Sequence, residues 1–221
     1  MKLVYKNMGH ILQFKAGYVN ELVVENKKMF FEMVSNISMQ SDGLHGDFVL
    51  SIKDKPVEFS KYADVTLQFA PFEVNRKTLL SKLCSAMENK ALHAENYMET
   101  CELLRDIEAY IHHLSEDFNF EITCQRMSIG PIIKALSPEI DSKDKDTLEK
   151  IFDYMELIRE LDRDRLFIMV NMRSYFSDED MNRFMESVCL HDFKVLLLES
   201  TAFAFLENTK RYTIDDDLCE F

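Results

Sequence analysis

Five basic residues in the first half of the sequence could contact a phosphate backbone. Lys53 and Lys55 border the turn after a predicted strand, and Arg76, Lys77 and Lys82 lie near the start of a predicted long helix. The polar face of that helix also carries small hydroxyl and amide side chains, Thr78, Ser85 and Asn89. Lysine and small polar groups contact phosphate oxygens without selecting a base. The pattern is typical of sequence-independent nucleic-acid contact, and an ordinary solvated helix face is the alternative that the residues leave open.

A group of acidic residues, Glu116, Asp117 and Glu121, follows the predicted helices. Clustered carboxylates on loops are the ligands that calcium prefers, but this spacing matches no EF-hand loop. The spacing alone therefore favours a solvated loop. The aspartates of the tail, residues 215–217, are likewise typical of a solvated terminus.

The sequence lacks the loops that bind nucleotide phosphates. It has five glycines and contains neither GxxxxGKS, GxxxxGKT nor GxGxxG. A P-loop ATPase also holds magnesium through an acidic residue after a hydrophobic strand, whereas the strand predicted at 166–170 ends in the neutral Asn171. No GxSxG or HExxH motif is present. We predict that the chain binds no nucleotide and is not an enzyme.

The elements around Asn171 predict an α/β fold. Unbroken apolar runs at 166–170 and 195–198 are typical of strands buried on both faces of a parallel sheet. Between them, Ser177 is a good N-cap, and acidic residues follow it in the first turn of a helix. Strand, helix and strand with short connections form a βαβ unit. Further strands are predicted at 2–5, 11–14, 19–24, 47–52, 64–70 and 211–214.

Helices dominate the middle of the chain. Asn26 is predicted to cap a first helix, and residues 75–114 have a nearly continuous helical pattern that predicts two long antiparallel helices. After them we expect a short strand at 118–124, a short helix from Gly130, a polar linker at 137–146 and a helix at 147–161. The predicted sheet domain therefore comprises residues 1–70 and 140–221, with a helical domain, residues 71–139, inserted between them.

The charge of the chain is divided unevenly. The net charge is −13, yet residues 1–90 hold 12 Lys and Arg against 10 Asp and Glu, while residues 91–221 hold 14 against 29. A polyanion could approach the first part while the second keeps the particle soluble, or the acidic helices simply have solvated faces. The five cysteines form no CxxC pair, no apolar run approaches a membrane span, and no signal peptide is apparent. These features predict a cytoplasmic protein with reduced thiols.

Several strand-end sequences carry a resemblance to a known family. They are VVEN at 23–26, PFEVN at 71–75, LFIMVN at 166–171, FSDED at 176–180 and VLLLES at 195–200, with the tail TIDDDLCEF. Together they resemble the type II-A CRISPR-associated adaptation proteins of the Csn2 family. The similarity extends over essentially the whole chain and rests on no single catalytic motif.

The resemblance implies a fold, a ligand and partners. It implies a P-loop-ATPase-like head domain that has lost its Walker motifs, with an inserted α-helical leg. It implies a homotetrameric ring that binds ends of double-stranded DNA without sequence preference during spacer acquisition in antiviral defence. It also implies calcium, with Glu116, Asp117 and Glu121 where similar proteins bind it, and partnership with the CRISPR integrase and the type II-A effector nuclease. The alternative is a divergent nucleotide-dependent α/β enzyme, an ATPase or a nuclease, with an unrecognised site.

Overall fold

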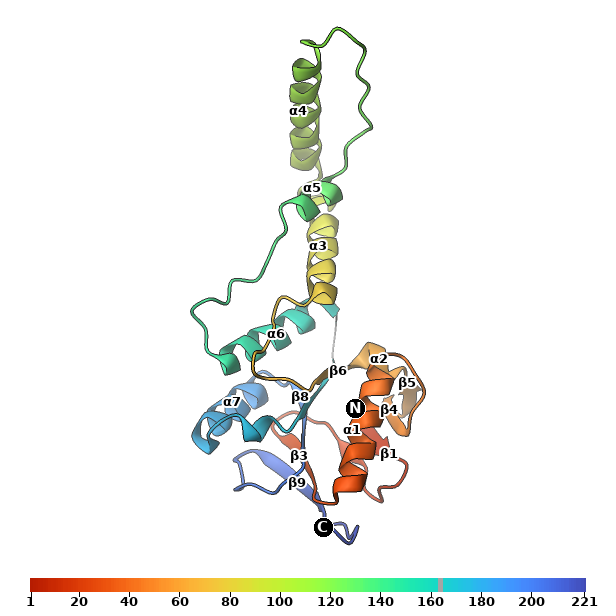
Figure 1. Cartoon of the computed structure of the whole chain (residues 1–221), viewed down its shortest axis with the longest axis vertical. Coiled ribbons are helices and arrows are strands. Elements are labelled where there is room, and N and C mark those ends of the chain that lie inside the picture. Colours follow the sequence, from red (N-terminus) through yellow and green to blue (C-terminus); the bar gives the residue numbers. More distant parts are fainter. Residues whose placement is uncertain (163–164) are drawn as a thin grey trace. The chain divides into compact units, whose positions relative to one another are not determined.

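A computed structural model describes residues 1–162 and 165–221. The chain divides into two compact units, one formed by residues 1–72 and 144–221 and the other by residues 73–143 (Figure 1). Among the described residues, no helix is both long enough and apolar enough to cross a membrane.

The first unit contains two sheets. One is a five-stranded parallel sheet in the order β6-β7-β8-β3-β9, and the other is an antiparallel sheet in the order β2-β1-β4-β5. The parallel strands are β3 (Val19–Val24), β6 (Ala63–Thr66), β7 (Leu166–Val170), β8 (Lys194–Glu199) and β9 (Thr209–Ile214). The antiparallel strands are β1 (Lys2–Tyr5), β2 (Leu12–Gln13), β4 (Phe48–Ile52) and β5 (Lys55–Val57).

The parallel sheet is covered on both faces, which explains its unbroken apolar strands. In β7 every residue is buried, and alternate side chains point to opposite faces. Leu166, Ile168 and Val170 join the core that includes helix α1 and the antiparallel sheet. Figure 1 shows α1 on one side of the parallel sheet and helices α6 and α7 on the other. The predicted α/β fold is confirmed.

Two helices of the first unit begin at the predicted caps. Helix α1 (Lys27–Ser41) starts at Asn26, whose side chain accepts a hydrogen bond from the Met29 amide at 3.0 Å. Helix α7 (Asp178–Leu190) starts at Ser177, whose hydroxyl accepts from the Asp180 amide at 3.2 Å. The other helices are α2 (Phe59–Tyr62), α6 (Thr147–Asp162) and the short 3-10 helix η1 (Met172–Ser174). The predicted β7-α7-β8 unit is therefore present.

The second unit is built from α3 (Lys77–Ala91), α4 (Tyr97–Ser115) and α5 (Ile129–Ala135). Helix α5 packs against α3. The predicted antiparallel pairing of the two long helices is wrong: α4 continues beyond α3 in the same direction (Figure 1). The short turn at 92–96 contains local hydrogen bonds, such as that from the Thr100 hydroxyl to the Ala91 carbonyl at 2.8 Å, and it does not reverse the chain.

Three other local predictions need correction. Residues 118–124 form no strand, because their alternating apolar side chains, including Phe118 and Phe120, are exposed and have no neighbouring strand to pair with in the described chain. The strand predicted at 64–70 ends at Thr66. Residues 54–56 were expected only to end the strand predicted at 47–52, but Lys55–Val57 form β5, which follows β4 through a two-residue turn at Lys53 and Asp54. Both turn residues have positive φ, as a tight hairpin turn requires.

Candidate functional site

The carboxyl edge of the parallel sheet is where ligands usually bind in this class of fold. In open α/β sheets the ligand lies outside the carboxyl ends of the strands, where the strand order reverses. Here that position lies between β3 and β8, which are adjacent although β6 and β7 separate them in the chain. Charged side chains fill this edge.

A buried arginine is the centre of this charge cluster. Arg173, on η1 just after β7, donates from Nη1 to Glu21 Oε1 and from Nη2 to Asp178 Oδ1, both at 2.7 Å. The side chains of Arg173 and Glu21 are fully buried. Arg211, on β9, donates from Nε to the other oxygen of Glu21 at 2.7 Å. Two guanidinium groups therefore compensate one buried carboxylate, as a buried charge requires.

Glu199 completes the cluster at the end of β8. Its Oε1 accepts a hydrogen bond from the Arg173 amide at 3.1 Å, and the residue is fully buried. Burial is the main cause that raises the pKa of Glu199 to about 7; the nearby charge of Glu21 acts in the same direction, and the hydrogen bond from the Arg173 amide opposes both. Glu199 is thus divided between its acid and its carboxylate forms near neutral pH.

Asn171 has a structural role at the same edge. It adopts a left-handed conformation with φ 53°, which asparagine tolerates better than most residues. Its backbone N–H donates to the Leu198 carbonyl at 2.8 Å, and its side-chain Oδ1 accepts from the backbone N–H of Ser200 at 2.9 Å. Asn171 therefore joins the turns after β7 and β8, at the position where the sequence led us to look for a magnesium ligand.

The start of α1 is joined to the C-terminal tail. The Glu25 amide donates to the Ile214 carbonyl at 2.8 Å, and the Asn26 side chain donates to the Asp216 carbonyl at 2.8 Å. The tail is also ordered within itself, because Asp215 Oδ1 accepts from the amides of Asp217 and Cys219. The connection from β3 to α1 is thus short, capped and without glycine, so it lacks the flexible backbone that commonly cradles a phosphate.

The five predicted DNA-contact residues are distributed over both units. Lys53 and Lys55 are exposed at the β4–β5 turn of the first unit. In the second unit, Arg76 is the N-cap residue of α3, Lys77 is exposed at its first turn, and Lys82 is half-buried on the same helix. The sequence prediction thus combines residues from separately folded parts.

Helix α3 presents the polar face that the sequence indicated. Thr78, Ser85 and Asn89 are exposed, and Leu79 and Cys84 are its buried residues. Charge is also divided between the helices of this unit. Helix α3 carries three lysines and one glutamate, whereas α4 carries one arginine and four acidic residues. Of these two helices, α3 is the one suited to a polyanion.

The three residues predicted to bind calcium lie on the surface of the second unit. Glu116, Asp117 and Glu121 are all exposed after α4. Glu116 lies 3.7 Å from His112 and 3.4 Å from His113, measured from its carboxylate oxygens to each Nδ1. Over residues 1–162 and 165–221, no group of three or more His, Cys, Asp or Glu side chains could hold a metal ion. Calcium binding by Glu116, Asp117 and Glu121 stays a prediction.

The buried charges were not predicted as a site. Glu21 lies within the apolar strand VNELVV, and Glu199 directly follows the apolar run at 195–198. A charged residue within or at the end of a buried strand is unusual, and this was the sequence signal that could have indicated the cluster. Arg173 and Arg211 carry no such signal, because only the folded sheet brings them to Glu21.

Two comparisons with known proteins bear on this arrangement. The family model described as CRISPR-associated protein (Cas_Csn2) matches residues 40–218. Among solved structures, that of Stu0660 of Streptococcus thermophilus superposes with a TM-score of 0.57 at 11% sequence identity, covering 90% of this chain and 68% of that one. At this identity the structural likeness concerns the fold. The family match extends over most of the sequence, and the chain belongs to the Csn2 family of CRISPR-associated proteins.

Proposed function

We propose that the protein acts in type II-A CRISPR adaptation, the role that its family membership supports. Within that process it is a non-catalytic ring that binds ends of linear double-stranded DNA without sequence preference. The observation that carries this proposal is the family match over residues 40–218. The geometry adds independent support for its separate parts.

The non-catalytic part is supported by the carboxyl edge of the parallel sheet. We interpret the first unit as a degenerate P-loop-like head, with β3 and α1 in the positions of the phosphate-binding strand and helix. The connection between them has no glycine, Asn171 joins two turns, and the ion pairs of Arg173 fill the edge. The residue directly after β7 is therefore neutral, and the connection from β3 to α1 is not a glycine-rich phosphate loop.

The DNA-binding part is supported by α3. Its exposed face combines Lys77 with small polar side chains, and its net charge is opposite to that of α4. Lysines contact phosphates as point charges, so such a face binds the backbone of any sequence. Lys53 and Lys55 provide a second exposed basic turn, on the other unit.

The ring is supported by the unpartnered apolar surface of the second unit, which we interpret as the family's leg. Only Thr100 is buried on the 19-residue helix α4. Its exposed large apolar side chains are Tyr97, Met98, Leu103, Tyr110, Ile111 and Leu114. Apolar side chains exposed together mark an interaction surface, and a second copy of the chain is the partner that a homotetramer requires. The integrase and the effector nuclease remain proposed partners from the family.

A salt titration of DNA affinity tests the proposal. We expect the wild-type protein to bind a linear duplex with an affinity that falls steeply with salt, by a slope of about −0.9 per contacted phosphate. Lys77→Gln with Lys82→Gln should weaken binding equally for unrelated sequences and flatten the slope. The matched control is Lys134→Gln with Lys143→Gln, which makes the same charge change outside α3. If both double variants have the same effect, α3 is not the contact face.

A further inference from the structure

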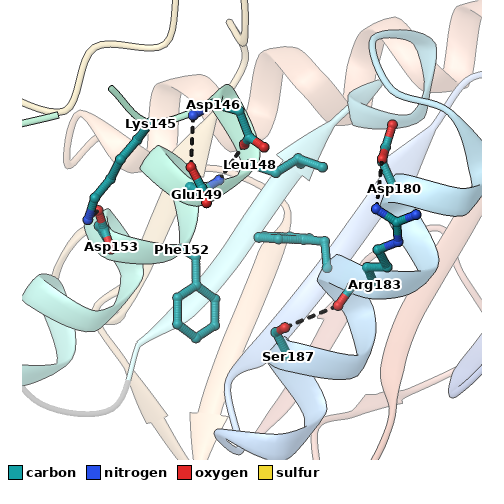
Figure 2. A pocket seen from close by; sticks show the side chains of 10 residues that line it. Lys145, Asp146, Leu148, Glu149, Phe152, Asp153, Asp180, Arg183 and Ser187 are labelled. Atoms are coloured by element: carbon teal, nitrogen blue, oxygen red, sulfur yellow. Dashed lines mark hydrogen bonds and ion pairs between the residues drawn. The ribbon is translucent and has the colours of Figure 1, made fainter. Parts of the chain in front are cut away.

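A groove lies between α6 and α7 of the first unit, away from the buried charges of the sheet edge. It has a volume of about 330 Å³, and its floor is formed by Leu148, Phe152 and Phe184. Figure 2 shows Leu148 and Phe152 pointing from α6 into the space that faces α7. The groove is therefore apolar at its base and large enough for an apolar side chain of a partner.

The floor of the groove is preorganised. Phe184 is only 5% exposed. Phe152 is half-buried, and its ring packs edge to face against Phe193 at 5.7 Å and against His191 at 5.0 Å between centroids. Rigid aromatic side chains at the base of a groove are favourable for binding because little conformational entropy is lost when a partner arrives.

The rim of the groove is acidic. It carries Asp146, which directly precedes α6, Glu149 and Asp153 from α6, and Asp180 from α7. Asp146 and Glu149 form a reciprocal capping box, in which each carboxylate accepts the other residue's amide at 2.8–2.9 Å. This arrangement fixes both carboxylates at the mouth of the groove.

The cations of the groove wall already have acidic partners. Lys145 donates to Asp153 at 2.5 Å, and Arg183 pairs with Glu179 and lies 4.0 Å from Asp180. The lining contains two cationic side chains and four carboxylates, so its net charge is negative. A basic partner is favoured by this charge, and an acidic one is repelled.

We propose that this groove binds a segment of a partner protein in which one apolar side chain is flanked by Lys or Arg. The apolar side chain enters between Phe152 and Phe184, and the basic residues lie over the carboxylates of Asp146, Glu149 and Asp180. This surface is distinct from the DNA-contact residues, because none of Lys53, Lys55, Arg76, Lys77 and Lys82 lines it. Recruitment of a protein and binding of DNA are therefore separable on this chain.

Peptide binding to the full chain tests the proposal. The probe is a fluorescein-labelled peptide, Gly-Arg-Lys-Phe-Lys-Arg-Gly, measured by anisotropy at physiological salt. A second peptide with Gly in place of Phe keeps the charge and removes the apolar anchor. We expect the loss of Phe to weaken binding at least fivefold. Equal affinity for the two peptides would show non-specific attraction to an acidic protein and overturn the proposal.

Two substitutions in the groove locate the site. Ser187→Trp fills the groove from its wall and should abolish the difference between the two peptides, whereas the matched control Ser35→Trp, on another helix, should preserve it. Glu149→Gln keeps the capping box, removes one rim charge and should weaken binding two- to fivefold, which provides a test even if Ser187→Trp does not fold. If both Glu149→Gln and a correctly folded Ser187→Trp bind the peptide as tightly as wild type, the peptide binds elsewhere on the protein.

The same variants distinguish other occupants and functions. If Ser187→Trp lowers the oligomeric state in sedimentation while the peptides bind wild type equally, the groove holds a second copy and the proposal is wrong. Affinity for linear DNA should be the same in Ser187→Trp and wild type. A loss of DNA binding only in Lys77→Gln with Lys82→Gln would concern the proposed function and leave the groove unaffected.

Discussion

At the scale of single residues, the sheet edge depends on buried charges that compensate one another. Glu21 and Arg173 are fully buried, Arg211 is nearly so, and Glu199 lies beside them. A group of this kind adds little net stability compared with apolar packing, but removing one member leaves another charge buried without its partner. Two predictions follow from the two kinds of group in the cluster.

The raised pKa of Glu199 predicts a pH-dependent stability. The folded state binds a proton at Glu199 up to about pH 7, whereas the unfolded chain releases it near the ordinary value of 4.5. The free energy of unfolding should therefore fall as pH rises from about 4.5 to about 7, by roughly 3 kcal/mol in total, and the contribution should be constant above this window. Urea titrations at several pH values measure it.

The matching variant is Glu199→Gln, which keeps the size and a hydrogen-bond acceptor and cannot ionise. The difference in unfolding free energy between wild type and variant should change with pH over this window in the stated direction. A difference that is the same at pH 4.5 and pH 8 would mean that Glu199 titrates normally.

Loss of Arg173 should destabilise the fold strongly. Arg173→Met removes a donor to Glu21 and leaves that carboxylate to Arg211 alone, so we expect a cost of about 3–5 kcal/mol. The control Arg183→Met removes an exposed ion pair and should cost less than about 1 kcal/mol. Adding Glu21→Gln to Arg173→Met should restore part of the loss, and a double variant less stable than Arg173→Met would refute the charge argument.

Calcium binding through Glu116 and Asp117 stays a prediction from the family. Among the described residues, no group of three or more His, Cys, Asp or Glu side chains could hold a metal ion, so we propose that groups from other copies complete the site. Calcium should then raise the melting temperature only of the assembled protein. Melting with and without calcium should differ for wild type and not for Glu116→Gln with Asp117→Asn. An equal calcium effect in both proteins would show that these residues are not ligands.

At the scale of elements, the helix caps and the buried strands could be predicted because neighbouring residues determine them. The caps at Asn26 and Ser177 and the buried runs of β7 and β8 are present as expected, because capping and two-sided burial are encoded by neighbouring residues. The strand predicted from the alternating pattern at 118–124 is absent, because a strand needs a partner strand that no local pattern specifies. The prediction that α4 runs antiparallel to α3 was wrong for a similar reason, since the turn at 92–96 contains no strong signal for chain reversal.

The connection between β3 and α1 predicts that nucleotides do not bind. Since Asn26 caps the helix and donates to the tail at Asp216, and Asn171 joins two turns, ATP with magnesium should leave the melting temperature unchanged. ATP hydrolysis should not exceed the buffer rate. A thermal shift with ATP, or turnover that co-purifies with the protein and disappears in Asn171→Ala, would favour the divergent-enzyme alternative.

At the scale of the whole molecule, the sequence allowed the family and the α/β class to be predicted, but not the charge cluster or the α6–α7 groove. Strand-end sequences are local, so they can be recognised without a structure. Glu21, Arg173 and Arg211 are separated by up to 190 positions, and only the parallel pairing of β3 with β9 and β8 brings them together. The basic residues Lys53 and Lys77 could be found in the sequence, whereas the DNA contact that we propose for them depends on the proposed ring.

Comparison of linear and closed circular DNA tests the central proposal most directly. A ring must pass over an end, so the protein should bind a linear duplex much more tightly than a covalently closed circle of the same sequence and length. Cutting that circle once should restore the affinity, and blocking both ends with a bulky protein should remove it. Equal affinity for the linear and the circular forms at the same salt concentration would contradict the proposal of a DNA-end-binding ring.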